Sequence, residues 1–481
     1  MTSSVDGLVS GLSTSSVISQ LMTVEAAPQT RLKSKVSTAQ TAVAAYQSVN
    51  TKLLAFKAAA EDLGRLSNWR AIKATPSSTS VTATPTGDLA STSGSLTFDV
   101  KYLATKQTTT LKVDTTATSL TSSLTINPGA YADDGTFTPG TPVTIDISAD
   151  QSAAGIAKAV NSANIGIKAY LVTTGSSSGV LQFSGANSGA ANGFTISGLD
   201  SAGIGGTDPA TTLPTDAVVQ VGGTTGAGYS VSSSTNTFTG LMSGVTITVS
   251  KQENGVTVDA AADVSGIAAK FQALVDTANA TLGEIGNQTA FDAGTNTSSP
   301  LTGDFMVRNM RQTILSAVSG GLTYANPAYT GPGDTTHPPT LADGSANPAY
   351  TGPADTTHAP TLDGGSLSKY GIQLNRDGQL AFNATKFTAS YNTDPTGIQQ
   401  AGRGLADNFV SLAAKQLTSV AAVMTGQNSE IDTINDQISN WDVRLVNKKA
   451  ALQKQYAGLE VALGKLKDQS SWLSGQLAGL S

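Results

Sequence analysis

The C-terminal stretch, residues 429–481, carries the pattern that most constrains how this chain can fold. Its apolar residues recur in steps of three and four over two runs. The first run comprises Ile431, Ile434, Ile438, Trp441 and Leu445, and the second comprises Leu452, Tyr456, Leu459, Leu463, Leu466, Leu473 and Leu477. This heptad pattern predicts a long helix with one apolar stripe, which the helix cannot bury by itself.

The two runs do not join in phase. The spacing slips by about one residue where Lys448 and Lys449 fall on the stripe. An inserted residue changes the local supercoil, so we expect the helix to bend or change neighbours there. Ser429, three residues before Asp432, is the expected N-cap. A two-helix hairpin inside one domain would also satisfy the pattern, but a helix that needs another segment or another chain fits it better.

The N-terminal region carries a matching stripe between residues 17 and 63. Its apolar residues again step by threes and fours, and they include Leu21, Leu32, Val36 and Val43. Pro28 interrupts the pattern, which predicts a short helix before it and a longer one from about residue 29 to a C-cap glycine at Gly64. We therefore expect the two ends of the chain to pair as a stalk.

The middle of the chain has a strand pattern. Residues 75–259 are rich in Ser, Thr and Gly, and apolar residues alternate with polar ones, as at Leu96, Phe98 and Val100. Short polar turns separate these segments, which predicts mostly antiparallel sheets in two modules. One helix is expected within them, around Ala153–Ala163.

These patterns together predict an α+β, multidomain fold: a helical coiled-coil stalk formed by both termini, a helical leg domain, and two mostly antiparallel β head domains inserted between them. The predicted division is residues 1–42 and 430–481 for the terminal coiled-coil leg, which we expect to be disordered in the isolated subunit; 43–75 and 260–429 for the helical leg domain; 76–108 and 215–259 for a β domain; and 109–214 for an outer β domain.

A duplication lies inside the predicted leg domain. Residues 326–341 read NPAYTGPGDTTHPPTL and residues 347–362 read NPAYTGPADTTHAPTL, 21 residues further on. Two copies rich in Pro and Gly do not suit a solenoid, so we interpret them as an expanded surface loop. We expect that deleting one repeat, residues 347–367 or thereabouts, leaves the fold intact, because loop length changes the free energy of folding little.

The only two histidines, His337 and His358, are equivalent positions of this duplication. A metal pair is one interpretation of them. No acidic or sulfur ligand accompanies them at metal-site spacing, so we favour two copies of an exposed turn residue and expect no metal site.

Composition argues against several classes of function. The net charge is −6 and no basic cluster exists, which argues against nucleic-acid binding. The absence of cysteine excludes disulfides and a Cys nucleophile. No Ser–His–Asp arrangement, metalloprotease motif or phosphate loop is present, so we expect no enzyme and no cofactor. No cleavable secretory signal or membrane span is expected, which suits a cytoplasmic protein or one exported unfolded by a dedicated channel.

Several segments resemble the flagellar filament cap proteins of the FliD type, the hook-associated protein 2 family. The resemblance is carried by VDGLVSGLSTSSVISQLMTVEAAPQTRL at residues 5–32, GSLTFDVKYLATKQT at 94–108, TNTFTGLMSGVTITV at 235–249 and LSKYGIQLNRDGQLAFNATKF at 367–387. IAKAVNSANIGIKAY at 156–170 looks like the Ile-Asn-type module of flagellins and caps, with Asn161 in its signature place.

This resemblance implies a secreted structural protein at the distal tip of the bacterial flagellar filament. It would form a ring as a homo-oligomer, a pentamer, that retains exported flagellin and promotes its polymerisation. Its other partners would be the hook–filament junction protein and an export chaperone, and the apolar stripes would form the coiled-coil and assembly interface. Two alternatives stay open: a secreted stalked adhesin that binds glycan or mucus, and another rod-like flagellar protein such as a hook–filament junction subunit.

Overall fold

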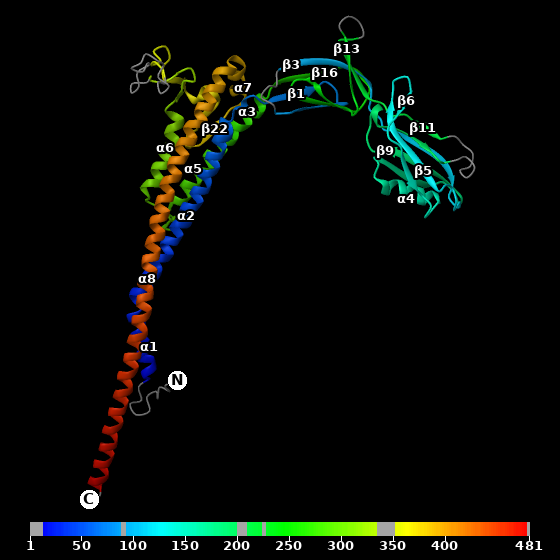
Figure 1. Cartoon of the computed structure of the whole chain (residues 1–481). Helices are drawn as coiled ribbons and strands as arrows, with labels where there is room; N and C mark the ends of the chain where they lie inside the picture. The colour runs from blue at the N-terminus through cyan, green and yellow to red at the C-terminus, as the bar shows by residue number, and fades with distance from the viewer. Residues whose placement is uncertain (1–12, 88–92, 200–208, 224–227, 334–351, 479–481) are drawn as a thin grey trace, which may run out of the picture. The chain divides into compact units, whose positions relative to one another are not determined.

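A computed structural model describes residues 13–87, 93–199, 209–223, 228–333 and 352–478. The chain divides into two compact units, Met1–Arg65 with Ile267–Ser481, and Leu66–Gly266. The first unit therefore joins the two ends of the chain, and helices dominate it (Figure 1). The second unit is one continuous segment built mainly of strands.

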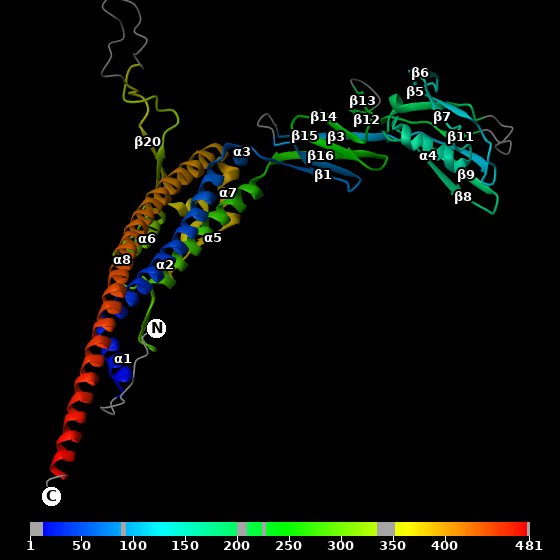
Figure 2. The same cartoon turned by 60° about the horizontal axis from the view of Figure 1, so that its bottom comes forward.

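Long helices form the first unit, and both views show α2 and α8 side by side (Figures 1 and 2). Its helices are α1 (Thr14–Glu25), α2 (Ala27–Gly64), α5 (Val264–Thr289), α6 (Phe305–Ser319), α7 (Ala384–Thr393) and α8 (Pro395–Ala478). Their apolar faces meet in a core that includes Tyr46, Val49, Leu53, Leu282, Ile285, Val307, Met310, Ile314 and Val420. Asp304 caps α6, because its side chain accepts a hydrogen bond from the Val307 amide.

The first unit also contains three small β-hairpins and a 3₁₀ turn among its described residues. They are β17 (Phe291–Asp292) with β18 (Thr297–Ser298), β19 (Leu322–Ala325) with β20 (Thr361–Gly365), the turn η2 (Leu367–Tyr370), and β21 (Ile372–Leu374) with β22 (Leu380–Phe382). The last pair is the strand–turn–strand that follows the duplication. The side chain of Asn279 on α5 holds it in place with two hydrogen bonds of 2.8 Å to the Leu380 backbone.

The second unit begins with a short helix, α3 (Leu66–Trp69), and contains two apolar cores. The first core lies between a five-stranded sheet in the order β1-β16-β3-β12-β13 and a three-stranded sheet in the order β14-β15-β2. These strands are β1 (Ile72–Pro76), β2 (Val81–Pro85), β3 (Gly94–Tyr102), β12 (Ala217–Val221), β13 (Tyr229–Ser233), β14 (Thr237–Met242), β15 (Val245–Val249) and β16 (Glu253–Ala262). Phe98 and Val100 point into this core, as their alternation predicts.

The second core is built from segments between β3 and β12. It contains the sheets β11-β4-β9-β8 and β10-β5-β6, with β7 also paired to β5. The elements are β4 (Thr108–Asp114), β5 (Ser123–Tyr131), β6 (Phe137–Pro139), β7 (Val143–Asp146), α4 (Ala153–Ala163), β8 (Ile167–Thr173), β9 (Ser178–Gly185), η1 (Ala190–Asn192), β10 (Gly193–Ser197) and β11 (Ala210–Thr212). Asn161 fastens α4 to β8, because its side chain accepts from the Ala169 amide and donates to the Ala169 carbonyl.

The structure corrects two helix ends. Ser429 is not an N-cap: it lies inside α8, which runs unbroken from Pro395, because no strong helix breaker separates the apolar residues before and after it. Gly64 is not a left-handed C-cap either, since α2 ends at Gly64 and Arg65 follows in an extended conformation. A side chain at Gly64 would lie 3.3 Å from Cβ of Ala406, so the glycine permits close approach of α2 to α8.

The predicted leg boundaries near residues 42 and 429 fall inside α2 and α8, where neither helix is interrupted. The four-part division of the chain remains a prediction.

Candidate assembly interface

The two terminal stripes pack against each other within one chain. Val36 and Val43 of α2 share a buried cluster with Ile431 and Ile434 of α8, and Leu32 and Ile438 pack at its edge. Residue numbers rise along α2 while those of the facing residues decline along α8, from Asp442 opposite Gln29 to Ala406 opposite Gly64. The two helices are therefore antiparallel. This segment of the seam is therefore occupied by the chain itself.

A buried polar residue interrupts the apolar seam. The side chain of Gln29 is 6% exposed, and its Nε2 donates to Asp442 Oδ1 at 2.5 Å and to the Ile438 carbonyl at 3.3 Å. A buried amide costs free energy unless it is hydrogen-bonded, so this contact favours one alignment of the two helices over others.

The next contact along α8 belongs to a different helix. Lys448 Nζ lies 3.5 Å from the carboxylate of Glu25, the last residue of α1. α1 and α2 meet at Ala26, between Glu25 and Gln29. The helix α8 thus changes neighbours from α2 to α1 at the predicted slip in its heptad pattern, and it does so without a break.

Beyond Lys448 the stripe becomes progressively exposed. Leu452, Tyr456 and Leu463 are half-buried, like Trp441 and Leu445 before them. Four leucines of the same run are exposed in the chain by itself, with exposed fractions of 48% for Leu459, 61% for Leu466, 55% for Leu473 and 61% for Leu477. The last three of these leucines are the part of the stripe that the chain leaves more than half exposed.

Two residues of the leg were missed in the sequence. On α1 the buried residue is Ile18, whereas the predicted Leu21 is 41% exposed. Both are apolar and lie one turn apart, so spacing by itself did not decide which of them faces α8. Gln29 is polar, so apolar periodicity does not identify it. The one indication in the sequence is its position between Leu21 and Leu32 of the apolar stripe.

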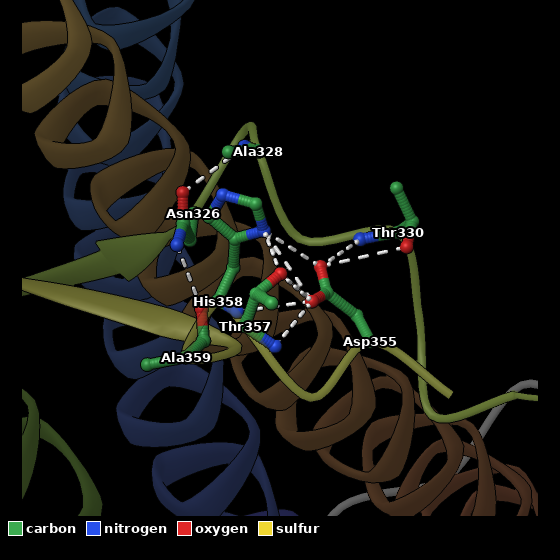
Figure 3. Close-up of polar contacts among 7 residues, drawn as sticks. All are labelled: Asn326, Ala328, Thr330, Asp355, Thr357, His358 and Ala359. Carbon is green, nitrogen blue, oxygen red and sulfur yellow. Dashed lines mark hydrogen bonds and ion pairs between the residues drawn. The ribbon is translucent and has the colours of Figure 1, made fainter. Parts of the chain in front are cut away.

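The duplicated loop contains the two histidines of the chain. His337 lies outside the described residues. His358 is half exposed, and its Nδ1 lies 3.0 Å from the carboxylate of Asp355 (Figure 3). The expectation that no acidic group accompanies the histidine was wrong, because the carboxylate stands three residues before it in the sequence. Among the described residues, however, no cluster of three or more His, Asp or Glu side chains could hold a metal ion.

None of the described helices combines the length and the apolar character that crossing a bilayer requires.

Comparison with known proteins covers almost the entire chain. Family models match for the flagellar hook-associated protein 2 C-terminus at residues 215–468, the flagellar hook-associated protein 2 N-terminus at 10–107, and the flagellin hook IN motif at 130–187. The last match includes α4 and Asn161.

Two relatives are similar over nearly their full length. Flagellar hook-associated protein 2 of Escherichia coli K12 and that of Escherichia coli O157:H7 are each 24% identical over 526 residues, covering 98% of this chain and 97% of the relative. The crystal structure of the D1-D2-D3 domains of the flagellar cap protein FliD from Escherichia coli matches with a TM-score of 0.51 and 21% identity, covering 80% of this chain and 99% of that chain.

The C-terminal family model alone spans more than half of the chain, and the N-terminal model adds the other half of the leg. The chain therefore belongs to the flagellar hook-associated protein 2 family, the proteins that cap the flagellar filament.

Proposed function

We propose that this protein is secreted and caps the distal tip of the filament as a ring of identical subunits, a pentamer, which retains exported flagellin and promotes its polymerisation. Its role is structural, and we assign it no catalytic step. Besides flagellin, its partners are further copies of itself, the hook–filament junction protein and an export chaperone. The assembly interface is the part of the α8 stripe that the chain leaves uncovered.

The observation that carries this proposal is the exposure of the distal stripe. Leu466, Leu473 and Leu477 follow one another at heptad spacing on one side of α8, and each is more than half exposed. Fully burying a leucine contributes about 1.5–3 kcal/mol, so covering the exposed part of the three contributes a few kcal/mol per subunit. A soluble chain gains nothing from such a stripe by itself, whereas a ring or a filament end can cover it in every subunit.

The alternatives have less support. A stalked adhesin needs no packing of the N-terminal helix against the C-terminal one, yet α2 and α8 form the buried pair described above. A hook–filament junction subunit would share helical ends, but the matches to both terminal models of hook-associated protein 2 favour the cap.

The test is a single charge placed on the stripe. Leu473→Asp leaves the isolated chain as stable as the wild type, within about 0.5 kcal/mol, because the side chain is already exposed. Burying its carboxylate at an interface costs several kcal/mol, and a ring repeats this cost in every subunit. We expect no end-on rings in electron micrographs, and flagellin released into the medium by a strain that carries this variant.

Ser471→Asp is the matched control. It adds the same charge two residues earlier, on the opposite side of the helix, and its side chain is also exposed. Rings and filaments should be normal in this variant. Normal filaments in the Leu473→Asp strain would contradict the assignment of the interface to this stripe.

A further inference from the structure

The tip of the β19–β20 hairpin is assembled from both copies of the duplication. Residues 326–333 are the first half of the first copy, and residues 355–362 are the second half of the second copy. Figure 3 shows the two segments facing each other and joined by hydrogen bonds. The described part of the loop therefore reproduces one complete copy, made of two halves that belong to different repeats.

A carboxylate joins the halves at one end. Asp355 accepts hydrogen bonds from the backbone amides of Thr330 at 3.1 Å, Thr357 at 2.9 Å and His358 at 2.9 Å. Its side chain is only 4% exposed although the loop around it is open. The amide donors hold the pKa of the Asp355 carboxyl well below its usual range.

A side-chain amide joins the halves at the other end. Asn326 donates from its backbone N–H to the Pro360 carbonyl at 3.0 Å and from Nδ2 to the Ala359 carbonyl at 2.8 Å. These contacts continue the ladder of β19 and β20, in which Ala325 pairs with Thr361. The two ends of the composite copy are thus fixed independently.

Gly331, Pro332, Gly333 and Asp355 are arranged as the four residues of a tight turn, although residues 334–354 separate the last two in the sequence. The Asp355 amide donates to the Gly331 carbonyl at 3.0 Å. Gly331, Pro332 and Gly333 would be followed directly by Asp355 if residues 334–354 were absent. Proline at the second position and a glycine with positive φ at the third are the signature of a type II turn, and Gly333 has φ of 79°.

The chain ends that such an excision would join already lie together. A Cβ built on Gly333 would be 2.4 Å from the Ala354 backbone nitrogen. Gly333 and Ala354 are equivalent positions of the two copies, 21 residues apart.

We propose that these two half-copies form a clasp, defined as residues 326–333 with 355–362, and that the clasp forms in the same way whatever the number of repeats inserted at the hairpin tip. The clasp uses the start of the first copy and the end of the last copy, so every whole number of copies supplies the same residues to it. Each extra copy enters between Gly333 and Asp355 and lengthens only the inserted segment, at a small cost in chain entropy. The surface of the protein can thereby display a longer or shorter segment without change to the fold beneath.

The sharpest test compares two deletions that differ by one residue. Deleting residues 334–354 keeps Gly333 before Asp355, whereas deleting residues 333–353 puts Ala354 at the same place in the turn. Alanine is strained at positive φ and glycine is not. Hydrogen exchange at the amides of Thr330, Thr357 and His358 should be as slow as in wild type for the first deletion, and about 5- to 30-fold faster for the second. A chain with a third copy inserted after Ala354 should match the wild type.

The carboxylate is tested in the shortened chain, where no second copy can replace it. Asp355→Ala in the 334–354 deletion should abolish the protection of the same three amides, while the thermal midpoint of the second unit stays unchanged. Fast exchange in the 334–354 deletion itself, or in the three-copy chain, would overturn the clasp. Equal exchange in the two deletions would overturn the turn on which it rests.

Discussion

The hydrogen bond between Gln29 and Asp442 predicts an asymmetry between its two partners. Asp442→Ala removes the acceptor at 2.5 Å and leaves the Gln29 amide buried, with only the Ile438 carbonyl at 3.3 Å. Gln29→Leu removes the buried amide and leaves Asp442, whose side chain reaches water. Asp442→Ala deprives a buried hydrogen-bond donor of its main acceptor, whereas Gln29→Leu leaves no buried polar group without a partner at this contact.

The expected magnitudes follow from this difference. A buried polar group that loses its partner costs about 1–3 kcal/mol. Because the Ile438 carbonyl remains within reach of Gln29, we place the cost of Asp442→Ala at about 1–2 kcal/mol. Gln29→Leu, which extends an apolar seam, should change stability by less than about 0.5 kcal/mol or increase it. In the double variant the cost of Asp442→Ala should disappear.

Amide hydrogen exchange of the leg measures these effects locally. Peptides covering residues 29–43 and 431–445 should exchange about 5- to 30-fold faster in Asp442→Ala, because each 1.4 kcal/mol is a factor of ten in the opening equilibrium. Asp436→Ala, an exposed carboxylate on the same helix, is the control and should leave exchange unchanged. If Gln29→Leu loosens the leg as much as Asp442→Ala does, the buried amide is not what matters and the reasoning fails.

Three further predictions concern packing, ionisation and the ends of the chain. Gly404→Ala should destabilise the first unit by about 1–3 kcal/mol in urea unfolding, since its Cβ would lie 2.2 Å from Cβ of Tyr324, whereas Gly426→Ala on the same helix meets nothing and should stabilise it by about 0.5–1 kcal/mol. Burial raises the pKa of Tyr370 to about 12; unfolded tyrosine ionises near 10, so the unfolded state loses its proton first and the urea midpoint should fall as the pH rises above about 10. Tyr370→Phe should weaken that dependence, and an unchanged profile would speak against this tyrosine. Limited proteolysis of the isolated subunit should cleave α8 after Leu452 before it cleaves the β sheets, because the distal stripe lacks a partner there; equal resistance of the two regions would mean that the helix is stable without assembly.

Periodicity predicted the existence and pairing of the leg helices well, since residues such as Val36 and Ile434 occupy a stripe that only another stripe can cover. The prediction of helix ends from residue type was wrong where other contacts determine the role of the residue. Ser429 is a good N-cap by residue type, but the helix before it never stops, and its hydroxyl instead donates to the Thr425 carbonyl one turn back. Gly64 is similarly a good C-cap by residue type, but its role is to allow α2 to approach Ala406 of α8 closely.

The duplication shows a limit of another kind. From the sequence, the two copies are interchangeable, which predicts that deleting residues 347–367 is as harmless as any other deletion of that length. The structure makes them unequal. Leu367 is 2% exposed, and a Cβ on Gly364 would lie 3.0 Å from the Leu322 side chain. That deletion would place Ala346 and Asp343 at these positions, so it should damage the packing of β20 and η2 that the 334–354 deletion preserves.

The polar contacts at the junction of α1 and α2 help to set the position of the exposed stripe along the leg. An apolar seam by itself tolerates a slip of one heptad, because leucine and isoleucine meet similar neighbours in either alignment. A slip toward the C-terminus would bring Lys449, which has no acceptor, opposite Gln29, and Gln455 opposite Glu25. The buried amide would lose its carboxylate partner and the Glu25–Lys448 pair would be broken. The observed alignment is therefore preferred over this slip, and it sets the position of Leu466, Leu473 and Leu477 along the leg. Identical subunits can then present these leucines in the same place, as the proposed ring requires of every copy.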